Sequence, residues 1–120
     1  MRKIAAPRRG DVYLVDFDPA VGCEIRKSRP ALIVQNDVGN RYSPLVIVAA
    51  ITSQFGGKIY PTEVPINAKD AGIGRDCVVL TNQIRTIDKQ RLIKKIGKFD
   101  SSIMAKVGQA LEISLGLIDL

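Results

Sequence analysis

The sequence contains no histidine and no tryptophan. Histidine is the side chain that titrates near neutral pH, so any acid–base chemistry here must use other groups. The two cysteines, Cys23 and Cys77, are too few for a disulfide framework, and neither has a second Cys or a His at metal-ligand spacing. We therefore expect two ordinary thiols rather than a disulfide or redox pair, with no bound metal and no cofactor.

Long hydrophobic runs are also missing. The longest, Leu45–Ile51, has the length of a strand and falls far short of the roughly 18 residues of a membrane span. The basic N-terminus, residues 1–9, has no hydrophobic stretch behind it and so does not resemble a secretory signal. We expect a cytoplasmic protein, and 120 residues most simply form one domain, 1–120, with its own core.

Acidic residues are outnumbered, with 18 Lys and Arg against 12 Asp and Glu, for a net charge of +6 and a pI near 9.6. This balance favours anionic partners, of which nucleic acid is the commonest. Aromatic residues are few, and only Phe17, Tyr42, Phe55 and Tyr60 are near polar loops where they could stack on bases. Base stacking is therefore a weak explanation of any RNA binding.

The hydrophobic pattern predicts a mainly β fold with one C-terminal helix, arranged as a small β-barrel or half-barrel. A long polar and basic loop covers residues 20–29, residues 36–40 have the composition of a turn, and Asp88 can cap one helical turn over residues 89–91. The helix carries apolar residues at spacings of three and four up to Leu115 and Ile118, is capped by Ser101 or Ser102, and is weakened by Gly108 and Gly116. Strands are predicted at 12–17, 30–35, 45–52, 62–66, 76–87 and 93–99.

The polar loop ends in a cluster of cations, Arg26, Lys27 and Arg29, next to Ser28. Pro30 biases Arg29 towards an extended backbone, so its guanidinium is mounted rigidly where a strand begins. A guanidinium in that position suits a phosphate, because it has a planar fork of donors and keeps its charge. The alternative is that Arg29 pairs with an acidic residue such as Asp16 or Asp76.

Two further polar groups follow predicted strands. Thr52, Ser53 and Gln54 come directly after the apolar run, where hydroxyls often form turns. They would lie beside Arg29 if the strands at 30–35 and 45–52 pair antiparallel. Residues 81–85 continue another strand with amides and a guanidinium, and the amides of Asn82 and Gln83 could either read base edges or satisfy backbone groups in a turn.

Four ordered segments, "RGDVYLVDFDPAVGCE" (9–24), "RPALIVQNDVGNRYSP" (29–44), "IVAAITSQ" (47–54) and "NQIRTIDKQRL" (82–92), resemble the MazF/PemK family of toxin–antitoxin ribonucleases. The resemblance covers nearly the whole chain. It implies an SH3-like barrel that forms a homodimer, cuts single-stranded RNA such as mRNA without a metal, and is inhibited by a cognate antitoxin whose acidic, MazE-like tail occupies the RNA groove.

The resemblance also implies site residues. The family's catalytic positions fall on Arg29 and Thr52, while members that use a histidine or an aspartate in the site offer no guide, because this chain has no histidine. Arg29 is the expected charge stabiliser and proton donor, Thr52 the expected hydrogen-bond donor to phosphate, and Glu24 the candidate base. The remaining expected RNA contacts are Arg26, Lys27, Ser28, Ser53, Gln54, Gln83 and Arg85.

Two other functions are compatible with these features. Toxins that poison DNA gyrase by protein contact share the expected fold, and a non-catalytic barrel could bind RNA and leave it intact. Cleavage of naked RNA by the purified protein distinguishes the ribonuclease from both.

Overall fold

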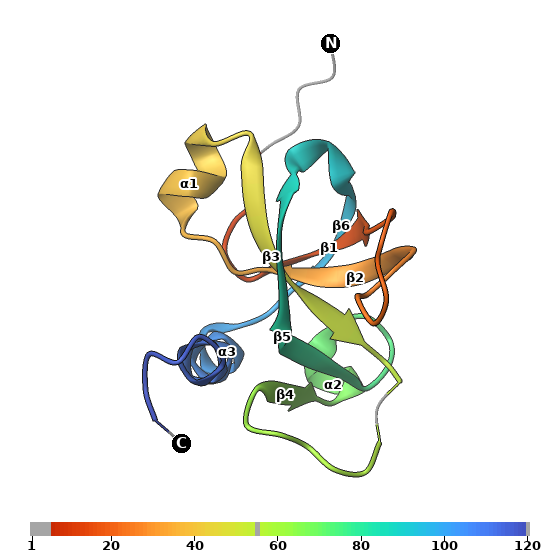
Figure 1. The fold of residues 1–120 in the computed structure, drawn as a ribbon, viewed down its shortest axis with the longest axis vertical. Helices are drawn as coiled ribbons and strands as arrows, with labels where there is room; N and C mark the ends of the chain where they lie inside the picture. The colour runs from red at the N-terminus through yellow and green to blue at the C-terminus, as the bar shows by residue number, and fades with distance from the viewer. Residues whose placement is uncertain (1–5, 55, 120) are drawn as a thin grey trace.

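The computed structural model describes residues 6–54 and 56–119; Phe55, one of the four aromatic residues considered for base stacking, and the first five residues of the basic N-terminus lie outside them. Within these ranges the chain forms one antiparallel sheet with helices at its margins (Figure 1). The elements are β1 (Asp11–Asp16), β2 (Ser28–Ile33), α1 (Asp37–Tyr42), β3 (Leu45–Thr52), β4 (Glu63–Ile66), α2 (Ala68–Ala71), β5 (Cys77–Asp88), the 3-10 helix η1 (Lys89–Arg91), β6 (Leu92–Lys98) and α3 (Ser101–Ser114).

The six strands are ordered β4-β5-β3-β2-β1-β6, which confirms the mainly β prediction. Strand β3 lies inside the sheet, and β4, which contains Pro65, lies at an edge, where a missing backbone N–H is tolerated. In the described part of the chain, β4 and β6 are not paired with each other, so the sheet stays open and a closed barrel is not formed. None of the described helices is long and apolar enough to cross a membrane.

Both faces of the central strands are buried. Along β2 and β3, Leu32 and Ala49 belong to one apolar cluster, whereas Ile33 and Val48 belong to another. Successive side chains of a strand point to opposite faces, so burial on both sides requires a continuous apolar run rather than an alternating one. This explains why Leu45–Thr52 carries so few polar residues.

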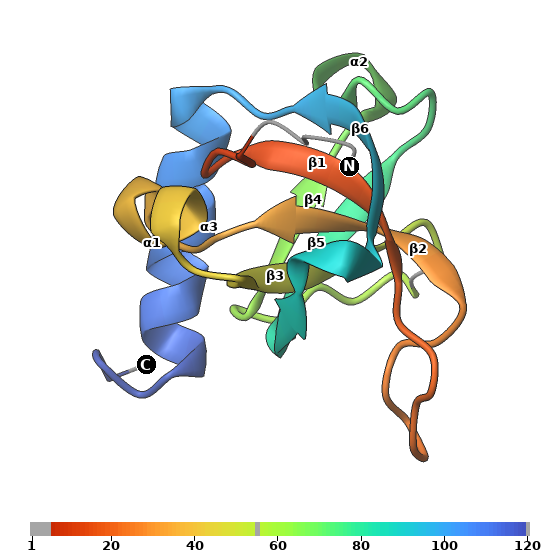
Figure 2. The same cartoon turned by 90° about the horizontal axis from the view of Figure 1, so that it is seen from above.

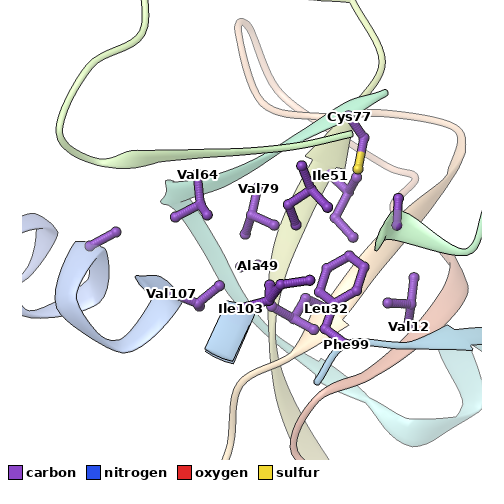
Figure 3. Close-up of a cluster of buried hydrophobic side chains, with 13 residues drawn as sticks. Val12, Leu32, Ala49, Ile51, Val64, Cys77, Val79, Phe99, Ile103 and Val107 are labelled. Carbon is purple, nitrogen blue, oxygen red and sulfur yellow. The ribbon is translucent and has the colours of Figure 1, made fainter. Parts of the chain in front are cut away.

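The first cluster lies between the sheet and α3 (Figure 3). Ile103 and Val107 of the helix approach Phe99 and Leu32, both fully or almost fully buried. The second cluster includes Phe17, which is also fully buried. Phe17 therefore cannot stack on a base, and of the aromatic residues considered for that role Tyr42 and Tyr60 are exposed.

Two local predictions need correction. The expected turn at residues 36–40 is a short helix, α1, because the Asn36 side chain accepts a hydrogen bond from the Gly39 N–H at 2.8 Å and caps its first turn. Strand β2 begins at Ser28, two residues before the expected start, so Arg29 lies within the strand and not at the end of the loop. The single helical turn after Asp88 is confirmed as η1.

The C-terminal helix is confirmed, but both its ends differ from the prediction. Asp100, not Ser101 or Ser102, is the N-cap: its carboxylate accepts from the Ile103 N–H at 2.9 Å, and this bond lowers the pKa of Asp100. The helix stops at Ser114, because Gly116 has a φ of 72° and the Leu117 N–H reaches back to the Glu112 carbonyl at 2.8 Å. Leu115 and Ile118 therefore lie beyond the helix and are exposed.

Candidate active site

Three strand ends meet at one end of the sheet. In the antiparallel order β5-β3-β2, the end of β3 lies between the beginnings of β2 and β5. The β2–β3 register ends at Ala31↔Ala50, and Arg29 and Thr52 each lie two residues beyond that pair. Thr52 pairs with Val78 of β5 on its other side. The expected antiparallel pairing, and with it the neighbourhood of Arg29 and Thr52, is confirmed.

The pairing of β2 with β3 opens at this end. Its recorded partners run from Ala31 to Ile33 and do not include Pro30, which has no N–H to donate. A pocket of about 350 Å³ lies beyond the point where the strands part. Its described lining comprises Ile25, Ser28, Arg29, Pro30, Ile51, Thr52, Ser53, Gln54, Ile73, Arg75, Cys77 and Ile96.

The lining combines two arginines with three hydroxyl side chains, and it includes no aspartate or glutamate among the described residues. Ile51 and Cys77, each only 1% exposed, join the pocket to the first core cluster. Burial, helped by the negative charge of Asp76, raises the pKa of the Cys77 thiol to about 11, so this thiol is protonated at neutral pH. The arrangement suits an anion that accepts several hydrogen bonds.

Arg29 has no acidic partner among the described residues, for no carboxylate lies within 4.0 Å of its guanidinium. The two acids considered for that role bind elsewhere. Asp16 accepts a hydrogen bond from the Asp18 N–H at 3.0 Å, and Asp76 accepts one from the Ala68 N–H at 2.6 Å. The exposed guanidinium of Arg29 is thus available to a ligand.

Thr52 has a structural role as well as a place in the pocket. Its hydroxyl accepts from the Gln54 N–H and donates to the Gln54 carbonyl, both at 3.1 Å, so it forms the turn that ends β3. Ser53 and Gln54 line the same pocket, as does Ser28 from the opposite strand. The predicted group at residues 52–54 therefore both forms a turn and faces the site.

The polar residues of β5 hold the β1–β2 loop. The Gln83 side-chain oxygen accepts from the Ile25 N–H at 2.7 Å, and the Arg85 guanidinium donates to the Phe17 carbonyl at 2.6 Å. Both residues line a second pocket of about 450 Å³, together with Glu24. The backbone-binding role considered for Gln83 is thus observed, and Arg85, expected only as an RNA contact, also binds a backbone carbonyl.

The loop itself extends away from the sheet (Figure 2). Glu24 accepts from the Val21 N–H at 2.6 Å and does not line the pocket that contains Arg29. Arg26 donates to the Gly22 carbonyl at 2.6 Å, and Lys27 adopts a φ of 65°. All three side chains are exposed, and neither Arg26 nor Lys27 lines the pocket.

Sequence reasoning missed Arg75 and Cys77 as members of the site. A signal for them existed: the residues just before a strand that pairs antiparallel with Leu45–Thr52 must lie near Thr52. Cys23 and Cys77 are both free, as expected. Among the described residues, no group of three or more Asp, Glu, Cys or His side chains could hold a metal ion.

Comparison with known proteins identifies the family. The sequence model of the PemK-like, MazF-like toxins of type II toxin–antitoxin systems matches residues 8–115. The chain belongs to this family. The chain is 56% identical over 112 residues to Endoribonuclease EndoA of Bacillus subtilis (strain 168), a match that spans 93% of this chain and 97% of EndoA.

Solved structures agree with the fold of this MazF-like chain. The crystal structure of MazF (Form-I) from Deinococcus radiodurans superposes with a TM-score of 0.80 at 28% identity, covering 94% of this chain and 99% of that one. A mycobacterial endoribonuclease in complex with its cognate antitoxin gives a TM-score of 0.77 at 27% identity, over 96% of this chain and 100% of the other.

Proposed function

We propose that this chain is an endoribonuclease toxin of a type II toxin–antitoxin system that cuts single-stranded RNA, including mRNA. The observation that carries the proposal is the pocket that Arg29 and Thr52 line together, with no carboxylate in the described lining. Family membership supplies the toxin–antitoxin context, and the relative EndoA is named an endoribonuclease.

The chemistry that suits this pocket is an intramolecular transesterification. The 2′-hydroxyl oxygen of the RNA attacks the adjacent phosphorus and loses its proton to a base. The bond from phosphorus to the 5′-oxygen breaks, and that oxygen takes up a proton. The products are a 2′,3′-cyclic phosphate and a 5′-hydroxyl end, and no metal ion is required for the balance.

Arg29 stabilises the charge that develops on the phosphorane, because its backbone is held in β2 and its guanidinium keeps its positive charge throughout the reaction. It is also the proton donor to the 5′-oxygen, although a guanidinium gives up a proton reluctantly. The Thr52 hydroxyl donates to the same phosphate by turning its single proton from the Gln54 carbonyl to a phosphate oxygen. Ser28, Ser53 and Gln54 supply further donors around it.

Glu24 is the candidate base, but it does not line the pocket proposed for the scissile phosphate. Its carboxylate binds the Val21 N–H within the loop, and the residue lines the second pocket rather than the first. We therefore expect Glu24→Gln to reduce kcat by less than about tenfold, whereas removal of a general base costs about 10²–10⁴-fold. A loss in that larger range would assign the base role to Glu24.

The same proposal covers the partners. The protein acts in the cytoplasm as one domain, 1–120, with an SH3-like barrel topology, and it forms a homodimer. A cognate antitoxin inhibits it by laying an acidic, MazE-like tail over the cations at the RNA groove. The tail is negatively charged and this chain has a net charge of +6, so their association should weaken as the salt concentration increases.

The test is cleavage of a short single-stranded RNA in excess EDTA by the wild type, Arg29→Ala and Thr52→Ala. The wild type should cut and leave a cyclic phosphate, and each variant should lose activity. Arg29→Lys should also be poor, since an ammonium keeps the charge but loses the planar fork. Both residues lie at strand ends and not in either core cluster. We therefore expect the free energy of unfolding of each variant to differ from the wild type by about 1 kcal/mol or less.

Other outcomes would contradict the proposal in distinguishable ways. Near wild-type cleavage by Arg29→Ala would show that Arg29 is not catalytic. Loss of wild-type cleavage in EDTA that only magnesium restores would show that the reaction depends on a metal ion. A wild type that binds RNA without cutting would be a plain RNA-binding protein. A wild type that leaves RNA intact but inhibits gyrase would be a topoisomerase poison of the same fold.

A further inference from the structure

Arg75 is the second cation of the pocket, and the proposed cleavage step gives it no task. It lies in the turn between α2 and β5, after Gly74, whose φ of 83° is a left-handed conformation that favours glycine. The Arg75 side chain is exposed and lines the pocket that contains Arg29 and Thr52. Its position is therefore accessible to a ligand in that pocket.

No described residue engages the charge of Arg75. No carboxylate is within 4.0 Å of its guanidinium, and no described hydrogen bond involves that group. The adjacent carboxylate of Asp76 is turned to the Ala68 N–H at 2.6 Å and so serves the start of α2. Two guanidinium groups without an acidic partner thus line one pocket that has no acid in its described lining, so the pocket favours anions.

The sheet sets the spacing of the two cations. Thr52 on β3 lies between β2, which carries Arg29, and β5, which Arg75 precedes. Neighbouring strands are about 4.8 Å apart, so two strand spacings, roughly 10 Å, separate β2 from β5. Arg75 also lies three residues before Val78, the β5 partner of Thr52, so it is offset along the strand direction from Arg29. Arg29 comes from the β2 side of Thr52, whereas Arg75 comes from the β5 side.

We propose that Arg75 forms a second phosphate subsite, which binds the RNA phosphate next to the scissile one. The pocket, about 350 Å³, falls within the roughly 300–1,000 Å³ of ligand sites and so has room for more than one phosphate group. The inference rests on the proposed ribonuclease function, because it takes the scissile phosphate to lie at Arg29 and Thr52. Arg75 is thus a positioning residue that sets affinity and register.

The experiment compares Arg75→Gln with Lys69→Gln, which removes one positive charge from the exposed face of neighbouring α2 without touching the pocket. Binding is measured by fluorescence anisotropy with a short RNA whose scissile nucleotide is 2′-deoxy and therefore cannot be cut. The probe is titrated across a series of KCl concentrations. Cleavage of the unmodified RNA gives KM and kcat in parallel.

For Arg75→Gln we expect Kd and KM to increase by about fivefold, the upper range for losing one exposed charged contact. The salt slope of log K should fall by about 0.7, the value for one phosphate contact on a single strand. The kcat at saturating RNA should stay at the wild-type value, because the scissile phosphate is held elsewhere. Arg75→Lys should restore the slope, and Lys69→Gln should match the wild type.

Three results would overturn the subsite. An unchanged slope and KM in Arg75→Gln would mean that the residue faces only water. A collapse of kcat would mean that Arg75 acts on the scissile phosphate itself. Labelled polyglutamate, titrated by the same anisotropy method, tests for an acidic protein partner. If Arg75→Gln bound it more weakly while the RNA salt slope stayed unchanged, the subsite would belong to an acidic protein. Failure of the ribonuclease proposal would be seen separately, as a wild type that does not cleave RNA. If the wild type binds RNA without cleaving it, the Kd and salt slope of Arg75→Gln can still be compared with those of the wild type.

Discussion

At the scale of single residues, the cations of this protein differ in what fixes them. Arg29 is held by a strand and a proline, and Arg75 by a turn at the start of β5. Arg26 and Lys27 belong to the projecting loop, where Arg26 binds the Gly22 carbonyl. A cation with a fixed backbone can hold a phosphate in one position for cleavage or for the register of the RNA. A cation in the projecting loop is better placed to contact phosphates outside the pocket.

The loop cations can be tested separately from the chemistry. We expect Arg26→Ala combined with Lys27→Asn to raise KM and to flatten the salt slope by about 1.4, twice the single-strand value for one phosphate. Asparagine is chosen because Lys27 has a φ of 65°, which asparagine tolerates better than alanine. The measurement is cleavage of a short RNA across a salt series.

In that experiment kcat should remain close to the wild type. An unchanged slope with an unchanged KM would show that both cations are solvated and make no RNA contact. A large fall in kcat would extend the catalytic centre beyond Arg29 and Thr52. Lys94→Ala, an exposed cation of β6 outside the pocket, is the charge-matched control for one of the two substitutions.

At the scale of secondary-structure elements, two glycines, one within α3 and one just after it, have opposite roles. Gly108 lies within the helix, where a new methyl group would meet only the Arg9 guanidinium at 3.9 Å, an ordinary contact. Gly116 follows the helix with a φ of 72°, in the left-handed conformation that reverses the chain. The sequence pattern suggested that both weaken the helix, and the structure shows that Gly116 ends it.

The two glycines predict opposite changes in stability. Gly108→Ala should raise the free energy of unfolding by about 0.5–1 kcal/mol, because alanine loses less backbone entropy in a helix. Gly116→Ala should lower it by about 1–2 kcal/mol, because alanine is strained at positive φ. Chemical denaturation of both variants against the wild type measures the difference; a stabilising Gly116→Ala would mean that α3 continues past Ser114.

Much of this element structure follows from the sequence. Continuous apolar runs locate β2 and β3, and the antiparallel pairing of these two strands is enough to bring Arg29 to Thr52. The errors are local: α1 depends on one side-chain cap at Asn36, and the end of α3 depends on the backbone of Gly116. Arg75 was missed because a pocket is defined by which strand ends adjoin, and sequence spacing alone does not give the strand order.

At the scale of the whole molecule, apolar side chains remain on the surface at several places, and two of these lie at helices. Val38 and Tyr42 of α1 are 72% and 74% exposed, and Leu115 and Leu117 after α3 are 61% and 70% exposed. Grouped apolar exposure of this kind marks contact surfaces more often than free surface. It agrees with the proposed homodimer.

We expect light scattering to give twice the 13.1 kDa of one chain at micromolar concentration. A charge placed in the interface should lower that mass, so Leu117→Lys and Val38→Lys distinguish the two apolar surfaces, each serving as the control for the other. A wild type that remains monomeric would contradict the dimer.

The pocket also has a consequence for the order of events during synthesis. Arg29, Thr52 and Arg75 come from the beginning of β2, the end of β3 and the entry to β5, so the pocket is complete only after β5 has paired with β3. These pairings join distant parts of the chain and form late relative to local structure. A nascent chain on the ribosome therefore has no complete pocket until most of its length has emerged. During that time the nascent chain itself cannot cut the message that encodes it.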